Sequence, residues 1–261
     1  MSTLLDKLAK LSEGRSQPIG FEAARARAKL YNMLLLAKIP LGYEKLLSAA
    51  VQENVDAFVF TLENRKKEKQ TISKYIAEIN EIPWGVIVTN ISKEDTQELL
   101  EMKCDFIVLT PDITPAYILK EENLGKVLQL DPSLDLELIR TIPRLSVDAI
   151  LLETGNQVTY PLTVHQLMTY ERLVGGTGKH ILATMPVDMP IEDMETMWEL
   201  GARGMIVDIT EENYRDRLIQ VKEAIKKLPT NKKKSKEKFG ALLPYITLQS
   251  PAEEPDEEED I

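Results

Sequence analysis

The sequence has little of what usually carries redox or metal chemistry. Among its 261 residues are one cysteine, Cys104, and two histidines. A single cysteine excludes an intramolecular disulfide, and its place at the head of an apolar run predicts a buried, unreactive thiol. Two histidines leave few imidazole groups for acid–base work or metal ligation.

Long apolar runs and excess positive charge are also missing. No run approaches the roughly 20 apolar residues of a membrane span, so we expect no membrane-spanning segment. The formal net charge of −10 gives no electrostatic reason to bind a polyanion, so we expect no nucleic-acid partner. Residues 1–11 mix leucines with charged residues, which predicts a short amphipathic helix and not a signal peptide. The expected compartment is the cytoplasm.

A short phrase, an aspartate followed by an apolar run, returns along the chain. It occurs at 56–61, 104–110 and 148–153, and a fourth copy at 203–208 has Arg203 in place of the aspartate. Between consecutive copies there is room for helix, strand and helix. The phrase therefore marks every second strand of a repeated β/α unit.

The whole pattern predicts a single (β/α)8 TIM barrel, a fold that commonly uses about 250 residues. The expected strands are 33–37, 57–62, 84–89, 104–110, 126–130, 149–152, 181–184 and 205–207. Helices are expected at 43–53, 71–80, 134–142 and 210–228, and after Ser92, Thr114, Thr163 and Pro190, with a charged loop at 63–69. Ser92 with Asp95, and Thr163 with Gln166, are spaced as capping boxes.

Three regions follow from this organisation. Residues 1–30 are an N-terminal extension, of which 13–21 is expected to cover the bottom of the barrel. Residues 31–228 form the barrel. Residues 229–261 comprise a basic linker, an apolar segment at 239–248 and an acidic tail that is expected to be disordered.

In this fold the working face is the carboxyl end of the strands. Thr61, Thr110, Glu153 and Asp208 stand at equivalent positions of the four phrases, so their side chains are expected to share one orientation. If that orientation is inward, they contribute two carboxylates and two hydroxyls to the barrel mouth. Further candidates at strand ends are Lys38, Gln129, Asp131 and Thr184.

The sharpest chemical hypothesis is a metal site. Asp131 and Glu153 end neighbouring strands, and carboxylates so placed can share a magnesium or manganese ion. In the alternative interpretation Asp131, before Pro132 and Ser133, caps a helix, while Glu153 pairs with Lys38 or with solvent.

Lys38, His165 and Asp208 are the candidate catalytic residues, and Thr61, Thr110, Gln129 and Thr184 are the candidate substrate-binding residues. Lys38 directly follows a strand, the position that a Schiff-base lysine would need. His165 lies in the first turn after the sixth strand's loop, where it serves as an acid or base or is simply a surface histidine.

The runs 82–86, 104–108 and 197–207 resemble strand passages of aldolase-type barrels, particularly the phosphate- and flavin-binding group that includes the nitronate monooxygenases. That resemblance implies the same fold, with glycine N–H groups after the last two strands gripping a phosphate. This chain has Pro186 and Asp208 there instead. Proline removes a donor and a carboxylate repels phosphate, which argues against flavin and sugar-phosphate ligands.

Two function classes remain. The first is an enzyme acting on a small polar molecule at the carboxyl-terminal rim, such as a metal-assisted lyase or aldolase. The second is a degenerate barrel that does not catalyse and serves in binding or assembly. In either class the apolar segment 239–248 is expected to dock on the barrel or on a second copy, forming a homo-oligomer.

Overall fold

A computed structural model of the chain describes residues 2–12, 32–62, 65–88, 91–153, 160–186, 189–209 and 214–228. Its strands are β1 Leu34–Ile39, β2 Ala57–Leu62, β3 Trp84–Val88, β4 Phe106–Leu109, β5 Gly125–Leu130, β6 Ala149–Leu152, β7 His180–Met185 and β8 Ala202–Asp208. Its α-helices are α1 Thr3–Ser12, α2 Glu44–Gln52, α3 Arg65–Ile79, α4 Lys93–Glu101, α5 Leu136–Ile139, α6 Val164–Thr177, α7 Ile191–Leu200 and α8 Tyr214–Lys227. Two 3₁₀ helices are η2 Ala116–Lys120 and η3 Ile142–Arg144.

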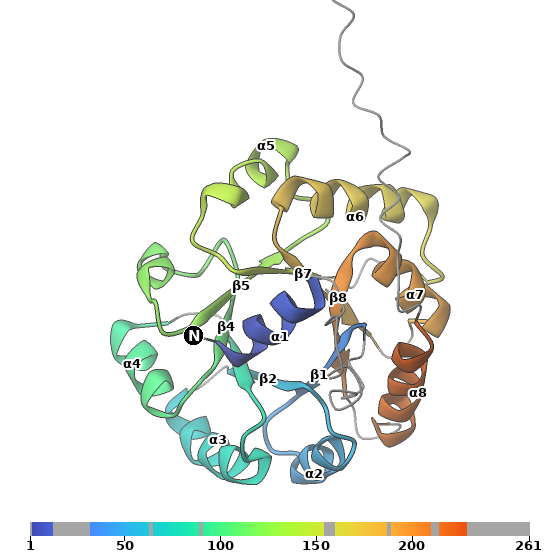
Figure 1. Ribbon diagram of the computed structural model, residues 1–261. Helices are drawn as coiled ribbons and strands as arrows, with labels where there is room; N and C mark the ends of the chain where they lie inside the picture. Colours follow the sequence, from blue (N-terminus) through green and yellow to red (C-terminus); the bar gives the residue numbers. More distant parts are fainter. Residues whose placement is uncertain are drawn as a thin grey trace, which may run out of the picture. The chain divides into compact units, whose positions relative to one another are not determined.

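The eight strands pair in sequence order, all parallel, and β1 closes the barrel by pairing with β8. Figure 1 looks along the barrel, with the helices arranged around the strands. The predicted (β/α)8 TIM barrel is therefore confirmed. The chain divides into two compact units, 1–228 and 229–261, and the second lies wholly outside the described residues. No helix among those described has the length and apolar character that crossing a membrane requires.

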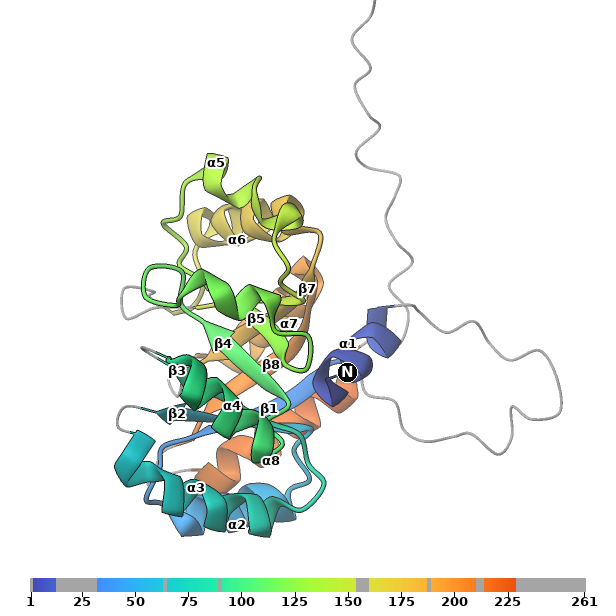
Figure 2. The ribbon, with the colours of Figure 1, turned by 90° about the vertical axis from the view of Figure 1, so that its left-hand side faces the viewer.

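The core has two parts because strand side chains alternate between two faces. One cluster fills the space between the outer faces of the strands and the surrounding helices. The other fills the inside of the barrel, and it includes Leu4 and Leu8 of α1, both fully buried. α1 therefore closes the amino-terminal end of the barrel, where Figures 1 and 2 place it.

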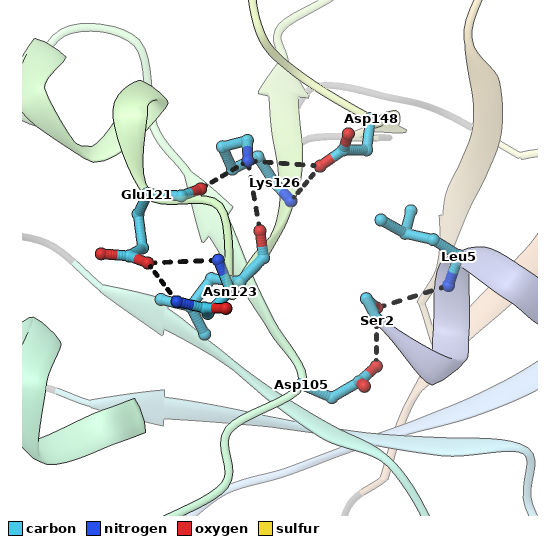
Figure 3. A network of polar contacts seen from close by, with 8 residues as sticks. Ser2, Leu5, Asp105, Glu121, Asn123, Lys126 and Asp148 are labelled. Carbon is cyan, nitrogen blue, oxygen red and sulfur yellow. Dashed lines mark hydrogen bonds and ion pairs between the residues drawn. The ribbon is translucent and has the colours of Figure 1, made fainter. Parts of the chain in front are cut away.

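Asp105, one of the repeated aspartates, holds the start of α1. Its carboxylate accepts hydrogen bonds from the Thr3 and Leu4 N–H groups at 2.6 and 2.9 Å. It also accepts from Ser2 Oγ at 2.8 Å, the contact drawn in Figure 3. A carboxylate is favourable at a helix N-terminus, where N–H groups lack partners within the helix. Gly125 leaves room for this contact, because a Cβ there would lie 2.9 Å from the Ser2 side chain.

The other two repeated aspartates join neighbouring strands at the same end of the barrel. Asp56 accepts from the Leu35 N–H at 2.9 Å, and Asp148 accepts from the Lys126 N–H at 2.8 Å. Asp148 also lies 3.8 Å from Lys126 Nζ, which donates to the Glu121 and Leu124 carbonyl groups (Figure 3). The repeated phrase thus marks strands β2, β4, β6 and β8, and its aspartates serve the barrel floor.

Both predicted capping boxes are present, on α4 with Ser92 and Asp95 and on α6 with Thr163 and Gln166. The expected charged loop at 63–69 is wrong, since α3 already begins at Arg65. The reason is that arginine, lysine and glutamate are good helix formers, so charge alone does not end a helix.

The helices expected after Thr114 and over 134–142 also differ from the prediction. The first is the five-residue 3₁₀ helix η2, and the second is split into α5 and η3. Pro143 explains the split, because its ring clashes with the carbonyl four residues earlier, that of Ile139, where α5 ends. The predicted floor segment 13–21 and the predicted helix cap Thr210 lie outside the described residues.

Candidate functional site

The inside of the barrel is built in layers, and the lower layers are apolar. Inward positions can be followed along each strand from the members of the interior cluster. From the floor upward these are small or apolar residues, with one exception: Leu34, Ala57, Gly85, Phe106, Gly125, Ala149 and Gly204, then Leu36, Val59, Ile87, Val108, Val127, Leu151, Leu182 and Ile206. The exception is His180, which completes the floor layer beside Ala149. Side chains thus fill the barrel up to its carboxyl end.

The next inward position is polar on each of the seven strands for which the structure describes it. Alternation brings seven described residues to this level: Lys38, Thr61, Thr110, Gln129, Glu153, Thr184 and Asp208. We call these seven residues the mouth layer. Thr184 is 8% exposed, and the others are partly exposed. The eighth position, Thr89 of the third strand, lies outside the described residues.

One charged pair joins β1 and β8 in the mouth layer. Lys38 and Asp208 are paired in the strand register, and Lys38 Nζ lies 3.0 Å from Asp208 Oδ1. Their side chains are 32% and 34% exposed. An ion pair this open to solvent adds about 0–1 kcal/mol to stability. Its chief effect is to neutralise the two charges locally.

A second polar pair joins β5 and β6. Gln129 Nε2 donates a hydrogen bond to Glu153 Oε2, and the Glu153 N–H donates to the Leu130 carbonyl at 3.2 Å. The Gln129 amide carries no charge, so it orients the Glu153 carboxylate without neutralising it. Among the described residues no cation pairs with Glu153.

Asp131 follows β5 and is held by the turn after it. Its Oδ1 accepts from the Ser133 N–H at 2.7 Å and from Ser133 Oγ at 2.5 Å. These bonds, the hydroxyl first, lower the pKa of Asp131 below its ordinary value. Asp131 therefore caps the turn at Pro132 and Ser133, whereas the start of α5 is capped by Asp135, which accepts from the Glu137 N–H.

The predicted metal ligands thus both have partners within the protein. The described residues contain no group of three or more His, Cys, Asp or Glu side chains placed to hold a metal ion. Asp131 and Glu153 could supply at most two protein ligands, with Asp131 Oδ2 and Glu153 Oε1 the oxygens not used in these bonds. This fits a divalent ion only if water or substrate completes its shell.

His165 lies in the first turn of α6 with an exposed side chain. Its carbonyl accepts from Thr169 Oγ1 at 3.0 Å, and within the described part of the chain no bond joins its ring to the mouth layer. Its predicted acid–base role stays a prediction. His180 opens β7 at the floor end, where burial lowers its pKa. Cys104 is buried, and burial raises its thiol pKa, as expected for an unreactive cysteine.

Sequence reasoning missed Tyr170, a buried residue of α6. Its hydroxyl is buried and has no hydrogen-bond partner among the described residues. Burial raises its pKa first of all, and Tyr160 and Asp131 raise it further. No sequence signal marks it, since a tyrosine in an amphipathic helix is an ordinary core residue.

No protein-family model matches the chain, and no curated protein matches it in sequence. Several solved structures resemble it. A mutant tryptophan synthase α-subunit from Pyrococcus furiosus has a TM-score of 0.56 and 12% identity, covering 75% of this chain and 97% of its own. A chain from a study of the tryptophan synthase complex of that organism has a TM-score of 0.54 and 13% identity, with coverages of 75% and 97%.

A protein from Aquifex aeolicus VF5 has a TM-score of 0.58 and 14% identity, covering 85% of this chain and 96% of its own. At these identities the likeness shows the fold alone. It supports the (β/α)8 TIM-barrel fold and gives no support to the finer resemblance to nitronate monooxygenases.

Proposed function

We propose that the chain binds a small polar molecule in the mouth layer and acts on it by general acid–base chemistry of the lyase or aldolase type. One observation carries the proposal. All seven described inward positions at the carboxyl end are polar, whereas the layers beneath them are apolar or glycine apart from His180 at the floor. Packing alone favours apolar side chains inside a barrel, so a polar layer at the working face indicates a ligand.

The two polar pairs lie on different sides of this mouth. Lys38 and Asp208 belong to the β8–β1 side, and Glu153 belongs to the β5–β6 side. A ligand between them would meet a carboxylate at one end and an ammonium group at the other. Cleavage of a carbon–carbon or carbon–heteroatom bond needs one group that removes a proton and another that supplies one to the leaving atom. Glu153 is our candidate base and Lys38 our candidate acid.

The threonines and the histidine have supporting roles in this proposal. Thr61, Thr110 and Thr184 would donate hydrogen bonds to ligand hydroxyl or carbonyl oxygens, and Gln129 would keep Glu153 oriented. His165 would assist proton transfer if α6 or the ligand brings its ring to the mouth. Asp208 would hold the Lys38 side chain in position before proton transfer.

A ligand screen tests the proposal. Amines, polyols, hydroxy acids and sugar phosphates would be screened by the change that each causes in melting temperature. We expect a polar compound to stabilise the wild type and to bind roughly 10- to 100-fold more weakly to Glu153→Gln or Lys38→Met, the usual range for losing a hydrogen bond to a charged group. Glu192→Gln, an exposed acid in the first turn of α7, is the control. Equal binding to all variants would rule out the mouth as the binding site.

The finer form of the proposal is metal-assisted, with Mg²⁺ or Mn²⁺ held by Asp131 and Glu153. The ion would polarise a substrate oxygen. In that case either ion raises the melting temperature of the wild type but not of the Asp131→Ala, Glu153→Ala double variant. Asp112→Ala, an exposed acid in the turn after β4, should respond as the wild type does. A shift of the same size in the double variant would contradict the two-carboxylate site.

The alternative is a barrel that binds without catalysis. The observation that favours it is the Lys38–Asp208 ion pair, because both side chains are already partnered. Product analysis discriminates the two: incubation of the stabilising compound with wild-type protein yields a cleaved product if the chain is a lyase. Return of the intact compound after many hours would favour the binding protein.

A further inference from the structure

An apolar pocket lies outside the barrel, on the face of β4 and β5 opposite to the mouth layer. It encloses about 260 Å³ between η2, α5 and η3, and its inner wall is formed by the outer faces of β4 and β5. Leu109, Leu128 and Leu130 form that wall. All of its lining residues belong to the described part of the chain.

The pocket exists because two crossover helices are short. The other connections from strand to strand contain helices of nine to fifteen residues, whereas η2 and α5 have five and four. A short helix covers less of the strands beneath it. Leu128 is accordingly 8% exposed, while its neighbours on the same outer face, Leu109 and Leu130, are 2% and 1% exposed.

The lining offers a ligand little but apolar contact. Aliphatic side chains, alanine and prolines make up the lining apart from Thr114 and Thr141. Thr114 Oγ1 accepts from the Thr110 N–H at 3.0 Å, and Thr141 Oγ1 donates to the Leu138 carbonyl at 2.7 Å. Each hydroxyl thus already has a hydrogen-bond partner within the protein, and no charged side chain lines the pocket. An ion would lose its hydration there without compensation.

The volume limits the size of the occupant. The pocket volume of about 260 Å³ is slightly below the roughly 300–1,000 Å³ of typical small-molecule sites, so a short chain fits and a large ligand does not. A helix, about 10 Å across with its side chains, is too wide to enter. Leu138 and Leu145 line the opening and are 55% and 38% exposed, so they are available to cover an occupant.

We propose that this pocket binds a short neutral apolar chain, free or as the tail of a small amphiphile whose head stays in solvent. Burying such a chain removes apolar surface from water on both partners, including the exposed part of Leu128. The proposal concerns a second site and does not depend on the proposed chemistry of the mouth layer.

Octan-1-ol is the probe, and ¹³C-methyl NMR of leucine-labelled full-length protein is the measurement. We expect saturable shifts at the methyl groups of Leu119, Leu128, Leu130, Leu138 and Leu145. Ala116 also lines the pocket and is exposed, so Ala116→Phe should fill the space and weaken octanol binding at least tenfold. Ala77→Phe, on the exposed face of α3, is the matched control and should bind octanol normally.

Chain length gives an independent check. Leu128→Ala deepens the pocket, so the alcohol that binds most tightly should become longer by about two or three carbons. Absence of saturable shifts at these methyl groups, or equal binding by Ala116→Phe and Ala77→Phe, would overturn the proposal. Self-association that Ala116→Phe abolishes, in protein that does not respond to octanol, would also overturn it and assign the pocket to a second copy.

Discussion

At the scale of single residues, equivalent aspartates of the repeated phrase have different roles. Asp56 and Asp148 bind N–H groups of the preceding strands, whereas Asp105 binds the start of α1. The surroundings of Asp56 disfavour the charged form of its carboxyl group. Burial raises its pKa above the ordinary value, and the Leu35 N–H, Lys7 and Lys222 only partly offset this effect.

This setting predicts an unusual pH dependence of stability. Because the folded-state pKa of Asp56 is raised, the folded protein takes up this proton at higher pH than the unfolded chain does. The stability that Asp56 contributes is fully present below about pH 4, the ordinary carboxyl pKa, and is lost as the pH rises through the folded pKa. The stability of wild type relative to Asp56→Asn should therefore increase as the pH falls from 7 to 4, measured by urea unfolding.

Asp131→Asn supplies a control of opposite sign. The folded pKa of Asp131 is lowered, so its contribution is present above about pH 4 and is lost as the pH falls through the folded pKa. The stability of wild type relative to this variant should decrease on acidification. Parallel pH profiles for the two variants would contradict the assignment of burial at Asp56 and hydrogen bonding at Asp131.

At the scale of elements, α1 is the part whose role was least visible. Its leucine spacing predicts an amphipathic helix, but not what the apolar face contacts. The answer lies in residues far along the chain: Asp105 caps the helix, and Leu4 and Leu8 join the interior cluster. Small residues at the floor, among them Gly125, leave the space that α1 occupies.

Leu8→Ala tests this closure of the floor. Leu8 is fully buried, and replacing a buried leucine by alanine typically costs about 2–5 kcal/mol of unfolding free energy. Lys10→Ala, an exposed position of the same helix, should cost little. The measurement is the urea midpoint together with amide hydrogen exchange in β7 and β8, strands that α1 contacts. Indistinguishable midpoints for the two variants would mean that α1 does not hold the barrel closed.

At the scale of the whole molecule, the predictions for the unit 229–261 are still to be tested. It lies outside the described residues, so the predicted docking of its apolar segment, 239–248, stays a proposal. The segment is expected to dock because its large apolar residues gain about 1.5–3 kcal/mol each on full burial, before ordering costs are subtracted.

Sedimentation velocity on the full chain tests whether this segment forms a homo-oligomer. We expect the wild type to self-associate at micromolar concentrations and the Leu243→Ser, Ile246→Ser double variant to be at least tenfold weaker in self-association. Glu257→Ser with Glu258→Ser, in the acidic tail, is the control and should associate as the wild type does. A monomeric wild type, or equal association of both double variants, would contradict oligomerisation through the segment.

Local sequence patterns were enough to predict the barrel. Strand alternation, capping boxes and helix spacing depend on residues that are near neighbours in the chain. The phrase with Asp56, Asp105 and Asp148 marks alternate strands. The same alternation predicts that Thr61, Thr110, Glu153 and Asp208 share one face. The period of two along a strand is a property of the backbone and does not depend on what the strand packs against.

Only the tertiary structure decided which distant residues pair with one another. Lys38 meets Asp208, which is 170 positions away, because barrel closure sets β1 beside β8 in that register. α1 meets Asp105 for the same reason, and the outer pocket opens where Pro143 ends a helix over a wall formed by distant strands. Such contacts depend on chain closure over long sequence separations, which a local pattern does not encode.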